Sequence, residues 1–182
     1  MIISRVAAEW PELKQKEAPF GQLPIFRENG KIYAQSKAII RHLARVLNRY
    51  GSNEEEHFLA DMYADLCGDW RRDYSAMAYS GEQYEAARKK YDETQLPRYI
   101  TLFNKALENK DYLLGSNICF ADYILWELVD INLKINEKLL ENAPALAAFH
   151  KRVAERPNIA KYIQEGNLNI PVNGAMAAIS NR

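Results

Sequence analysis

The chain has 182 residues, of which 48% are apolar and 26% charged, and its 24 basic residues balance its 24 acidic residues to a formal net charge of zero. This length predicts one or two domains with a sizeable core, and the composition is that of a globular chain and not of a disordered one. Without an excess of either charge, neither nucleic acid nor an anionic membrane is an expected partner.

Two cysteines, Cys67 and Cys119, lie far apart and without metal-ligand spacing. This pattern predicts buried thiols and neither a disulfide framework nor a metal site. The N-terminus lacks the pattern of a secretory signal, and no run approaches the ~18 apolar residues of a membrane span. We therefore expect a cytoplasmic protein.

The first part of the chain, residues 1–51, predicts a small α/β module. Asn29-Gly30 between two apolar runs is a strong hairpin signal, and Ser36 is placed to cap the helix that follows. Pro24 falls at the start of its strand, where a strand tolerates proline. The expected elements are a strand Ile2–Val6, a short helix Trp10–Lys16, a hairpin of Leu23–Glu28 and Lys31–Ala34, and a helix Gln35–Asn48.

Residues 52–166 predict an all-helical domain, and 167–182 an irregular tail. Ser52–Glu55 reads as a capping box that opens a long helix. Pro97 predicts a kink within a second helix, from about Glu82 to Asn109, because it removes one backbone hydrogen bond. Later helices are expected over Phe120–Leu133, from Pro144 and from Pro157. The first helix is expected to bury a face of Leu59, Met62, Tyr63, Leu66 and Trp70.

No nucleotide-binding, zinc-protease or serine-hydrolase motif occurs, and the three histidines are expected on helix surfaces. The richest stretch is Pro19–Pro24 followed by Gln35-Ser36. A strand that starts Leu23-Pro24 leaves the Leu23 backbone free to pair with an extended ligand, and a helix start favours a carboxylate. This combination suits a small extended peptide with an acidic end. The alternative is that Pro24 only punctuates an edge strand and Ser36 only caps a helix.

Several motifs, in order, resemble the glutathione transferase family, and most of all its sigma class of invertebrate enzymes and prostaglandin D synthases. They are Glu9–Lys14, Pro19–Pro24, Gln35–Ile39, Asp111–Gly115 and Phe120–Asp122. The resemblance covers roughly residues 1–164. It implies an α/β plus all-α protein: an incomplete thioredoxin-like N-terminal module followed by the family's all-helical C-terminal domain.

The resemblance also implies a glutathione site, with glutathione as co-substrate and no metal. Trp10 and Lys14 would hold the glycine carboxylate, with Lys16 as the substitute for Lys14 if the register shifts. Gln35 and Ser36 would bind the γ-glutamyl carboxylate. The full expected set is Trp10, Lys14, Gln22, Leu23, Pro24 (held cis in the family), Gln35, Ser36 and, from the partner subunit of a homodimer, Asp69.

Each of these residues has a simpler interpretation. Trp10 would then be a packing anchor, Lys14 a solvated charge and Asp69 part of a polar helix face. Phe20 either locks into the partner subunit or belongs to the core. Four aromatic residues either line an apolar co-substrate site or fill the core and interface: Tyr63, Trp70, Tyr74 and Tyr79.

Two departures from the family pattern matter. Cys119 stands where the family has serine or threonine, opposite Asp122, and a thiol is a weaker cap by on the order of 1 kcal/mol. We therefore expect Cys119→Thr to raise the melting temperature. In addition, Met1 aligns with about the second strand of the family's fold. The resemblance therefore implies that on the order of thirty residues, about one βαβ unit, are absent before it. No residue matches the tyrosine that stabilises the glutathione thiolate, so we assign no catalytic residue.

Three hypotheses follow. The first is a glutathione transferase that conjugates the thiolate to electrophilic small molecules, with weak activity as printed because lowering a thiol pKa needs a positioned donor. The second is a non-catalytic glutathione or lipophile binder, or a crystallin-like dimer scaffold. The third is that Met1 is an internal start within a complete enzyme, which the coding sequence upstream would decide.

Overall fold

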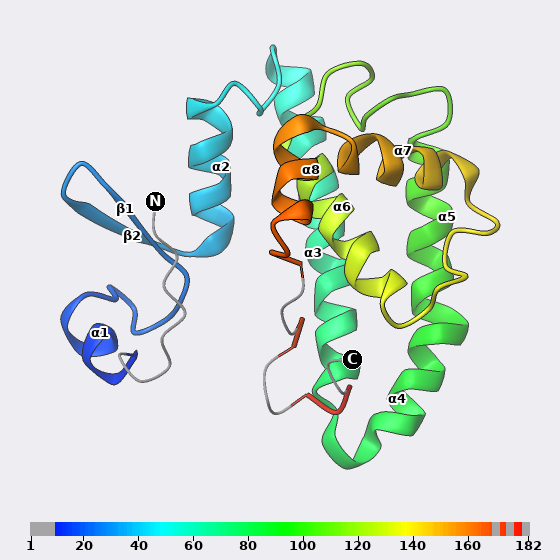
Figure 1. The fold of residues 1–182 in the computed structure, drawn as a ribbon, viewed down its shortest axis with the longest axis horizontal. Helices are drawn as coiled ribbons and strands as arrows, with labels where there is room; N and C mark the ends of the chain where they lie inside the picture. Colours follow the sequence, from blue (N-terminus) through cyan, green and yellow to red (C-terminus); the bar gives the residue numbers. More distant parts are fainter. Residues whose placement is uncertain (1–9, 169–171, 174–176, 180–182) are drawn as a thin grey trace. The chain divides into compact units, whose positions relative to one another are not determined.

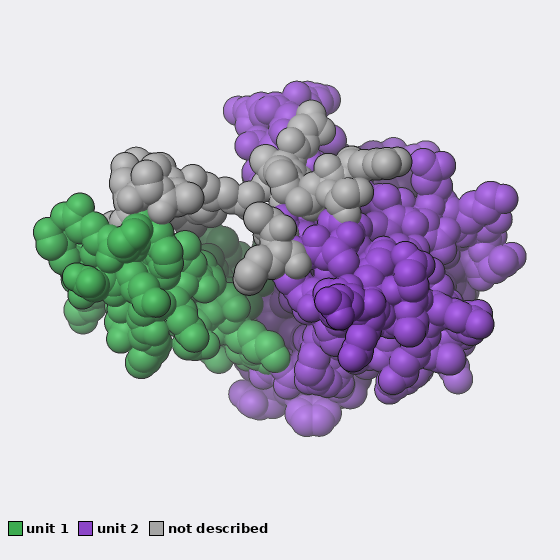
Figure 2. All heavy atoms as spheres, turned by 90° about the horizontal axis from the view of Figure 1, so that it is seen from below, with its two compact units in different colours: residues 1–50 green, residues 51–182 purple. Residues whose placement is uncertain are grey.

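The computed structural model describes residues 10–168, 172–173 and 177–179, so the strand expected at Ile2–Val6 lies outside the described residues. The chain divides into two compact units, residues 1–50 and 51–182 (Figure 2). None of the described helices is long and apolar enough to cross a membrane.

Unit 1 contains two short helices and a hairpin (Figure 1): α1 (Trp10–Lys16), β1 (Ile25–Glu28), β2 (Lys31–Ala34) and α2 (Ser36–Val46). The strands pair antiparallel, with Phe26 opposite Tyr33. Asn29 and Gly30 adopt φ values of 50° and 74°, which confirms the predicted hairpin turn, since a type I′ turn needs positive φ at both central residues. The first strand begins at Ile25, two residues later than predicted.

The start of α2 differs from the prediction. Gln35 directly precedes the helix with a φ of 71°, and its side chain makes no capping hydrogen bond. Ser36 is therefore the first helical residue and not the cap. His42 lies on the helix surface, as expected, with its side chain 43% exposed. Its Nε2 lies 2.9 Å from the Glu28 carboxylate, and its ring stacks on Tyr33 with centroids 6.0 Å apart. These contacts hold the hairpin against α2.

Unit 2 is helical, as Figure 1 shows. Its elements are α3 (Glu54–Ala78), a 3-10 turn η1 (Gly81–Gln83), α4 (Tyr84–Lys90), a π-helical turn η2 (Tyr91–Gln95), α5 (Leu96–Ala106), α6 (Phe120–Leu133), α7 (Pro144–Ala154) and α8 (Pro157–Gln164). The predictions for the helices that begin at Phe120, Pro144 and Pro157 are confirmed. The predicted helix from Glu82 to Asn109 is instead two helices joined by η2.

Proline explains that break. Pro97 has no N–H to donate four residues back, and the N–H of Leu96 bonds to the Tyr91 carbonyl, five residues back. The helix widens by one residue immediately before the proline. Pro97 is therefore preceded by a π-helical turn, while the kink predicted there stays a prediction.

The cap and the buried face of α3 also differ from the predictions. Asn53 is the cap, since its side chain accepts from the Glu56 N–H at 2.9 Å, and the Glu56 carboxylate accepts from the Ser52 N–H at 2.6 Å. Ser52 is therefore not the cap that the sequence predicted. Of the five residues expected on the buried face, only Trp70 is buried. The core-facing side instead starts with small residues that allow close packing on α6: Ala60, Ala64 and Cys67, followed by Trp70, Tyr74 and Met77.

A chain of buried hydrogen bonds joins three elements of this core. The Trp70 Nε1–H donates to the Tyr91 hydroxyl at 2.7 Å, which donates to Asn132 Oδ1 at 2.7 Å. Asn132 Nδ2–H donates in turn to the Leu128 carbonyl at 2.8 Å. Every polar group in this chain therefore has a partner, which buried polar groups require.

Candidate functional site

Gln35 lies at the start of α2, where the sequence predicted a site for a ligand carboxylate. The Gln35 carbonyl accepts from the N–H groups of Ala38 and Ile39, both at 3.0 Å. Its side-chain amide lies 3.5 Å from the side-chain oxygen of Gln22. Gln35 and Ser36 are both exposed, so this helix start is open to a ligand carboxylate.

The Gln22–Pro24 segment leads directly into β1. Its three side chains are exposed, with Leu23 at 60%, and the Leu23–Pro24 peptide bond is cis, as the family resemblance implied. β1 pairs with β2 on one side, and this pairing begins at Ile25. The Leu23 backbone therefore precedes the paired region, which suits an extended ligand laid alongside it.

Helix α1 carries the predicted ligands of the second carboxylate. Trp10 is half-buried, whereas Lys14 and Lys16 are exposed. Lys16 pairs with Glu12 at 2.7 Å, one helical turn away. Among the described residues Lys14 has no carboxylate within ion-pair distance, so of the two lysines it is the one whose charge is available.

Asp69 lies on α3 and is the predicted site residue that belongs to unit 2. Its side chain is 49% exposed and pairs with Arg72 at 2.7 Å. Arg72 was not among the residues expected at the site, although an acid and a base three residues apart on a helix are a recognisable pair.

The aromatic residues considered for an apolar co-substrate site divide into two groups. Trp70 and Tyr74 are buried in the core of unit 2, whereas Tyr63 is half-buried and Tyr79 is 46% exposed. Burial raises the pKa of Tyr74, although its hydroxyl accepts a hydrogen bond from Asn173. The core interpretation therefore holds for Trp70 and Tyr74.

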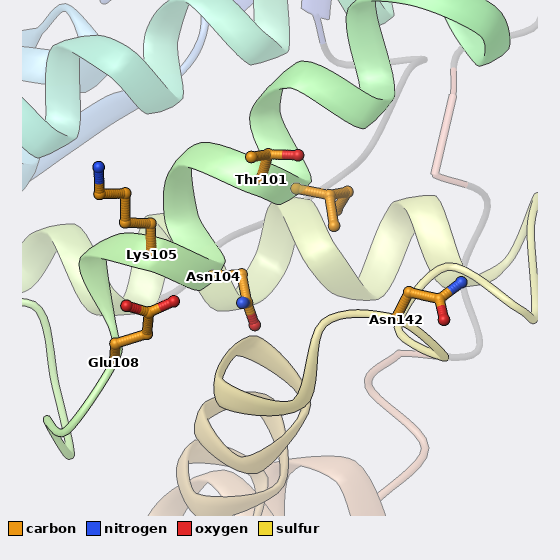
Figure 3. Close-up of a pocket in the computed structure, with 6 residues that line it drawn as sticks. Thr101, Asn104, Lys105, Glu108 and Asn142 are labelled. Atoms are coloured by element: carbon orange, nitrogen blue, oxygen red, sulfur yellow. The ribbon is translucent and has the colours of Figure 1, made fainter.

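A shallow groove on unit 2 is lined by none of the predicted site residues. Figure 3 shows its lining, with Thr101, Asn104, Lys105 and Glu108 from α5 and Asn142 from the segment before α7. Asn104 Oδ1 accepts from the N–H groups of Ala145 and Leu146 at 3.0 and 3.2 Å. It thereby caps the first turn of α7, so this polar group serves the fold.

Cysteine and metal chemistry find no support in the described structure. Cys67 and Cys119 are free and buried, and burial raises the pKa of both thiols, which favours the protonated form over the reactive thiolate. Within the described residues, no group of three or more histidine, cysteine or acidic side chains could hold a metal ion.

Comparison with known proteins identifies the family. Residues 68–166 match the model described as glutathione S-transferase, C-terminal domain. The chain is 38% identical over 171 residues to a glutathione S-transferase P of Caenorhabditis elegans, covering 91% of this chain and 81% of that protein. A glutathione S-transferase of Dirofilaria immitis is 37% identical, over 85% of this chain and 76% of its own length. The chain therefore belongs to the glutathione S-transferase family, with a thioredoxin-like fold.

Solved structures agree with this assignment. The Pi-class glutathione S-transferase of Onchocerca volvulus superposes with a TM-score of 0.87 and 32% identity, over 97% of this chain and 86% of that one. Rat hPGDS complexed with a quinoline is a more distant neighbour, at a TM-score of 0.76, 24% identity and coverage of 88% and 80%, which shows the fold alone. The higher-identity relatives are thus of the Pi class, whereas the sequence motifs suggested the sigma class.

Proposed function

We propose that this chain binds glutathione in unit 1 and that the full site transfers the glutathione thiolate to electrophilic small molecules. The observation that carries the proposal is the exposed, side-chain-uncapped start of α2, where Gln35 meets Gln22 beside the cis Leu23–Pro24 bond. Family membership supplies the ligand, and this arrangement supplies groups for both its backbone and its γ-glutamyl carboxylate. We propose Pi-like rather than sigma-like specificity, on the identities of the relatives.

The ligand contacts follow the chemistry of each group. Leu23 would pair with the cysteinyl unit through its backbone, and Gln35 and Ser36 would hold the γ-glutamyl carboxylate at the positive end of α2. Lys14 and Trp10 would hold the glycine carboxylate. Gln22 would line the site and orient Gln35.

Glutathione binding tests the proposal directly. Isothermal titration calorimetry of the full chain should give saturable binding, and Gln35→Leu should weaken it about ten-fold because it removes a hydrogen bond to a charged group. Gln164→Leu, at an exposed position on α8, is the matched control and should bind as the parent does. Equal affinities for the two variants would count against the site.

Turnover is a separate measurement. Conjugation of glutathione to a chloronitrobenzene reports transfer of the thiolate to an electrophile. Retention on immobilised glutathione without turnover would favour the binding or scaffold role. Failure to bind would leave only the scaffold role.

We propose that the chain forms a homodimer. The proposed role of Asp69 depends on this dimer, because Asp69 would contact the γ-glutamyl amino group of the glutathione that the partner subunit binds. The support for the dimer is apolar surface on both units: Phe20 is 66% exposed, Phe58 is 69% exposed and Met62 is 44% exposed. Light scattering coupled to size-exclusion chromatography should give twice the 21.0 kDa chain mass. Phe58→Ser should shift the mass toward the monomer.

We also propose a cytoplasmic location. The two buried thiols are unpaired, which fits a reducing compartment.

A further inference from the structure

The loop between α1 and β1 turns at Gly21, directly against Lys14. Gly21 has a φ of +60°, and its N–H bonds to the Ala18 carbonyl at 2.9 Å. A Cβ at this position would lie 3.2 Å from Cε and 3.6 Å from Cγ of Lys14. The aliphatic stem of Lys14 therefore lies on the bare backbone of Gly21, while the residue as a whole stays exposed.

Two independent requirements meet at Gly21. The left-handed conformation is one that side chains with a Cβ rarely adopt, and a Cβ there would press on the Lys14 stem, which would have to move by a few tenths of an ångström. The contrast with Lys16 is informative. Lys16 pairs with Glu12 on its own helix, whereas the stem of Lys14 lies against Gly21, in the loop that leads to Gln22 and Leu23.

We infer that Gly21 is a positioning residue for glutathione, which seats the Lys14 stem so that its ammonium group meets the glycine carboxylate. The inference rests on the proposed function, in which Lys14 binds that carboxylate. Without the seat, Lys14 would keep its charge but lose a defined direction, because a free lysine side chain samples many rotamers.

The test replaces Gly21 and compares it with a second glycine of similar conformation. Gly30 has a φ of +74°, and a Cβ there would meet nothing within 4 Å. Gly30→Ala therefore imposes similar backbone strain in the same unit without touching a lysine. Gly21→Ala is the primary variant, and Gly21→Asn is used if the alanine variant fails to fold, since asparagine tolerates positive φ better.

Binding to two ligands separates positioning from general damage. Calorimetry with glutathione should show about two- to five-fold weaker binding for Gly21→Ala than for Gly30→Ala, the scale of an exposed ion pair. With γ-glutamylcysteine, which lacks the glycine unit, the two variants should bind equally. In a Lys14→Met background, Gly21→Ala should weaken glutathione binding no further.

The possible failures are distinguishable. If Lys14→Met binds glutathione as the parent does, the proposed role of Lys14 is wrong and the inference falls with it. If Lys14→Met weakens binding but Gly21→Ala and Gly30→Ala bind glutathione equally, only the inference is overturned. If Gly21→Ala weakens the binding of glutathione and of γ-glutamylcysteine equally, the inference is also overturned, because that result means general damage to the loop.

Discussion

The backbone N–H of Cys119 donates to the Asp122 carboxylate at 2.8 Å, and the other oxygen of the same carboxylate accepts from the Leu113 N–H at 2.9 Å. Asp122 is fully buried, and its burial raises the pKa of the carboxyl group. One side chain thus closes the first turn of α6 and fixes the Tyr112–Gly115 turn before it. The family motif that the sequence showed at Phe120–Asp122 has this structural role.

Replacement of Asp122 by asparagine should therefore destabilise the fold. Asparagine has one oxygen, so one of the two buried backbone N–H groups would face an amide NH₂ and lose its acceptor. We expect a loss of about 1–3 kcal/mol in the free energy of unfolding, measured by urea denaturation. Glu141→Gln, at an exposed position, is the control. A difference between the two variants below about 0.5 kcal/mol would contradict this role.

The cap at Cys119 should be improved by a hydroxyl. Cys119 occupies the cap position in extended backbone, as predicted, and its thiol stands where a capping box has a hydroxyl. Oxygen accepts more strongly than sulfur, so Cys119→Ser should raise the melting temperature by about 2–4 °C in a thermal unfolding scan.

Cys119→Thr, the substitution suggested by the sequence, should also raise it, provided that the buried site takes one more methyl group. Cys119→Ala, which offers no acceptor, is the matched control and should not stabilise. A melting temperature for Cys119→Ser at or below that of the parent would mean that the hydroxyl gains no hydrogen bond there.

The local signals of the sequence predicted most elements correctly. Asn29-Gly30 marked the hairpin and Pro144 and Pro157 marked helix starts, because each acts through its own backbone geometry. The buried face of α3 was wrong for a different reason. Large apolar residues were counted, but Ala60, Ala64 and Cys67 make the buried side because α6 approaches closely there, and such an approach depends on the partner helix.

The candidate site shows the same division. The motif at Pro19–Pro24 and the helix start at Gln35 could be read from the sequence, since both are contiguous. The seat of Lys14 on Gly21 could not, because it depends on how the loop folds back on α1. Neither could the contact of His42 with Glu28, which joins residues from two elements.

Tyr91 offers a test of the buried polar chain in unit 2. Tyr91→Phe would leave the Trp70 Nε1–H without an acceptor and Asn132 Oδ1 without a donor, both in the core. Each orphaned group costs about 1–3 kcal/mol, so we expect a combined loss of about 2–4 kcal/mol by urea denaturation. Tyr162→Phe, at a residue that is 45% exposed, removes the same atom at the surface and should change little.

The same variant tests the π-helical turn. Tyr91 is the first residue of η2, so loss of its hydrogen bonds should increase hydrogen exchange of amides in Tyr91–Gln95 before those of α6. If Tyr91→Phe and Tyr162→Phe have the same free energy of unfolding in urea, the buried polar chain contributes nothing to stability.

Tyr99 should make the stability of unit 2 sensitive to alkaline pH. Its hydroxyl donates to Asp73 at 2.7 Å, and burial, together with this hydrogen bond, raises the pKa of Tyr99 from 10.0 to about 12. A tyrosine that holds its proton more tightly when folded stabilises the fold at pH values below its unfolded pKa. That stabilisation is lost as the pH rises through the folded pKa.

Comparison with Tyr99→Phe isolates this effect, because the other titrating groups are shared. Below pH 10 the parent should be more stable than Tyr99→Phe by about 1 kcal/mol, the net value of one hydrogen bond, and this difference should be constant. Between pH 10 and 12 it should shrink, because the parent must ionise a buried hydroxyl beside a carboxylate. Urea denaturation at a series of pH values measures the difference, with Tyr162→Phe as the exposed control. A difference that stays constant to pH 12 would mean that Tyr99 ionises as it does in the unfolded chain.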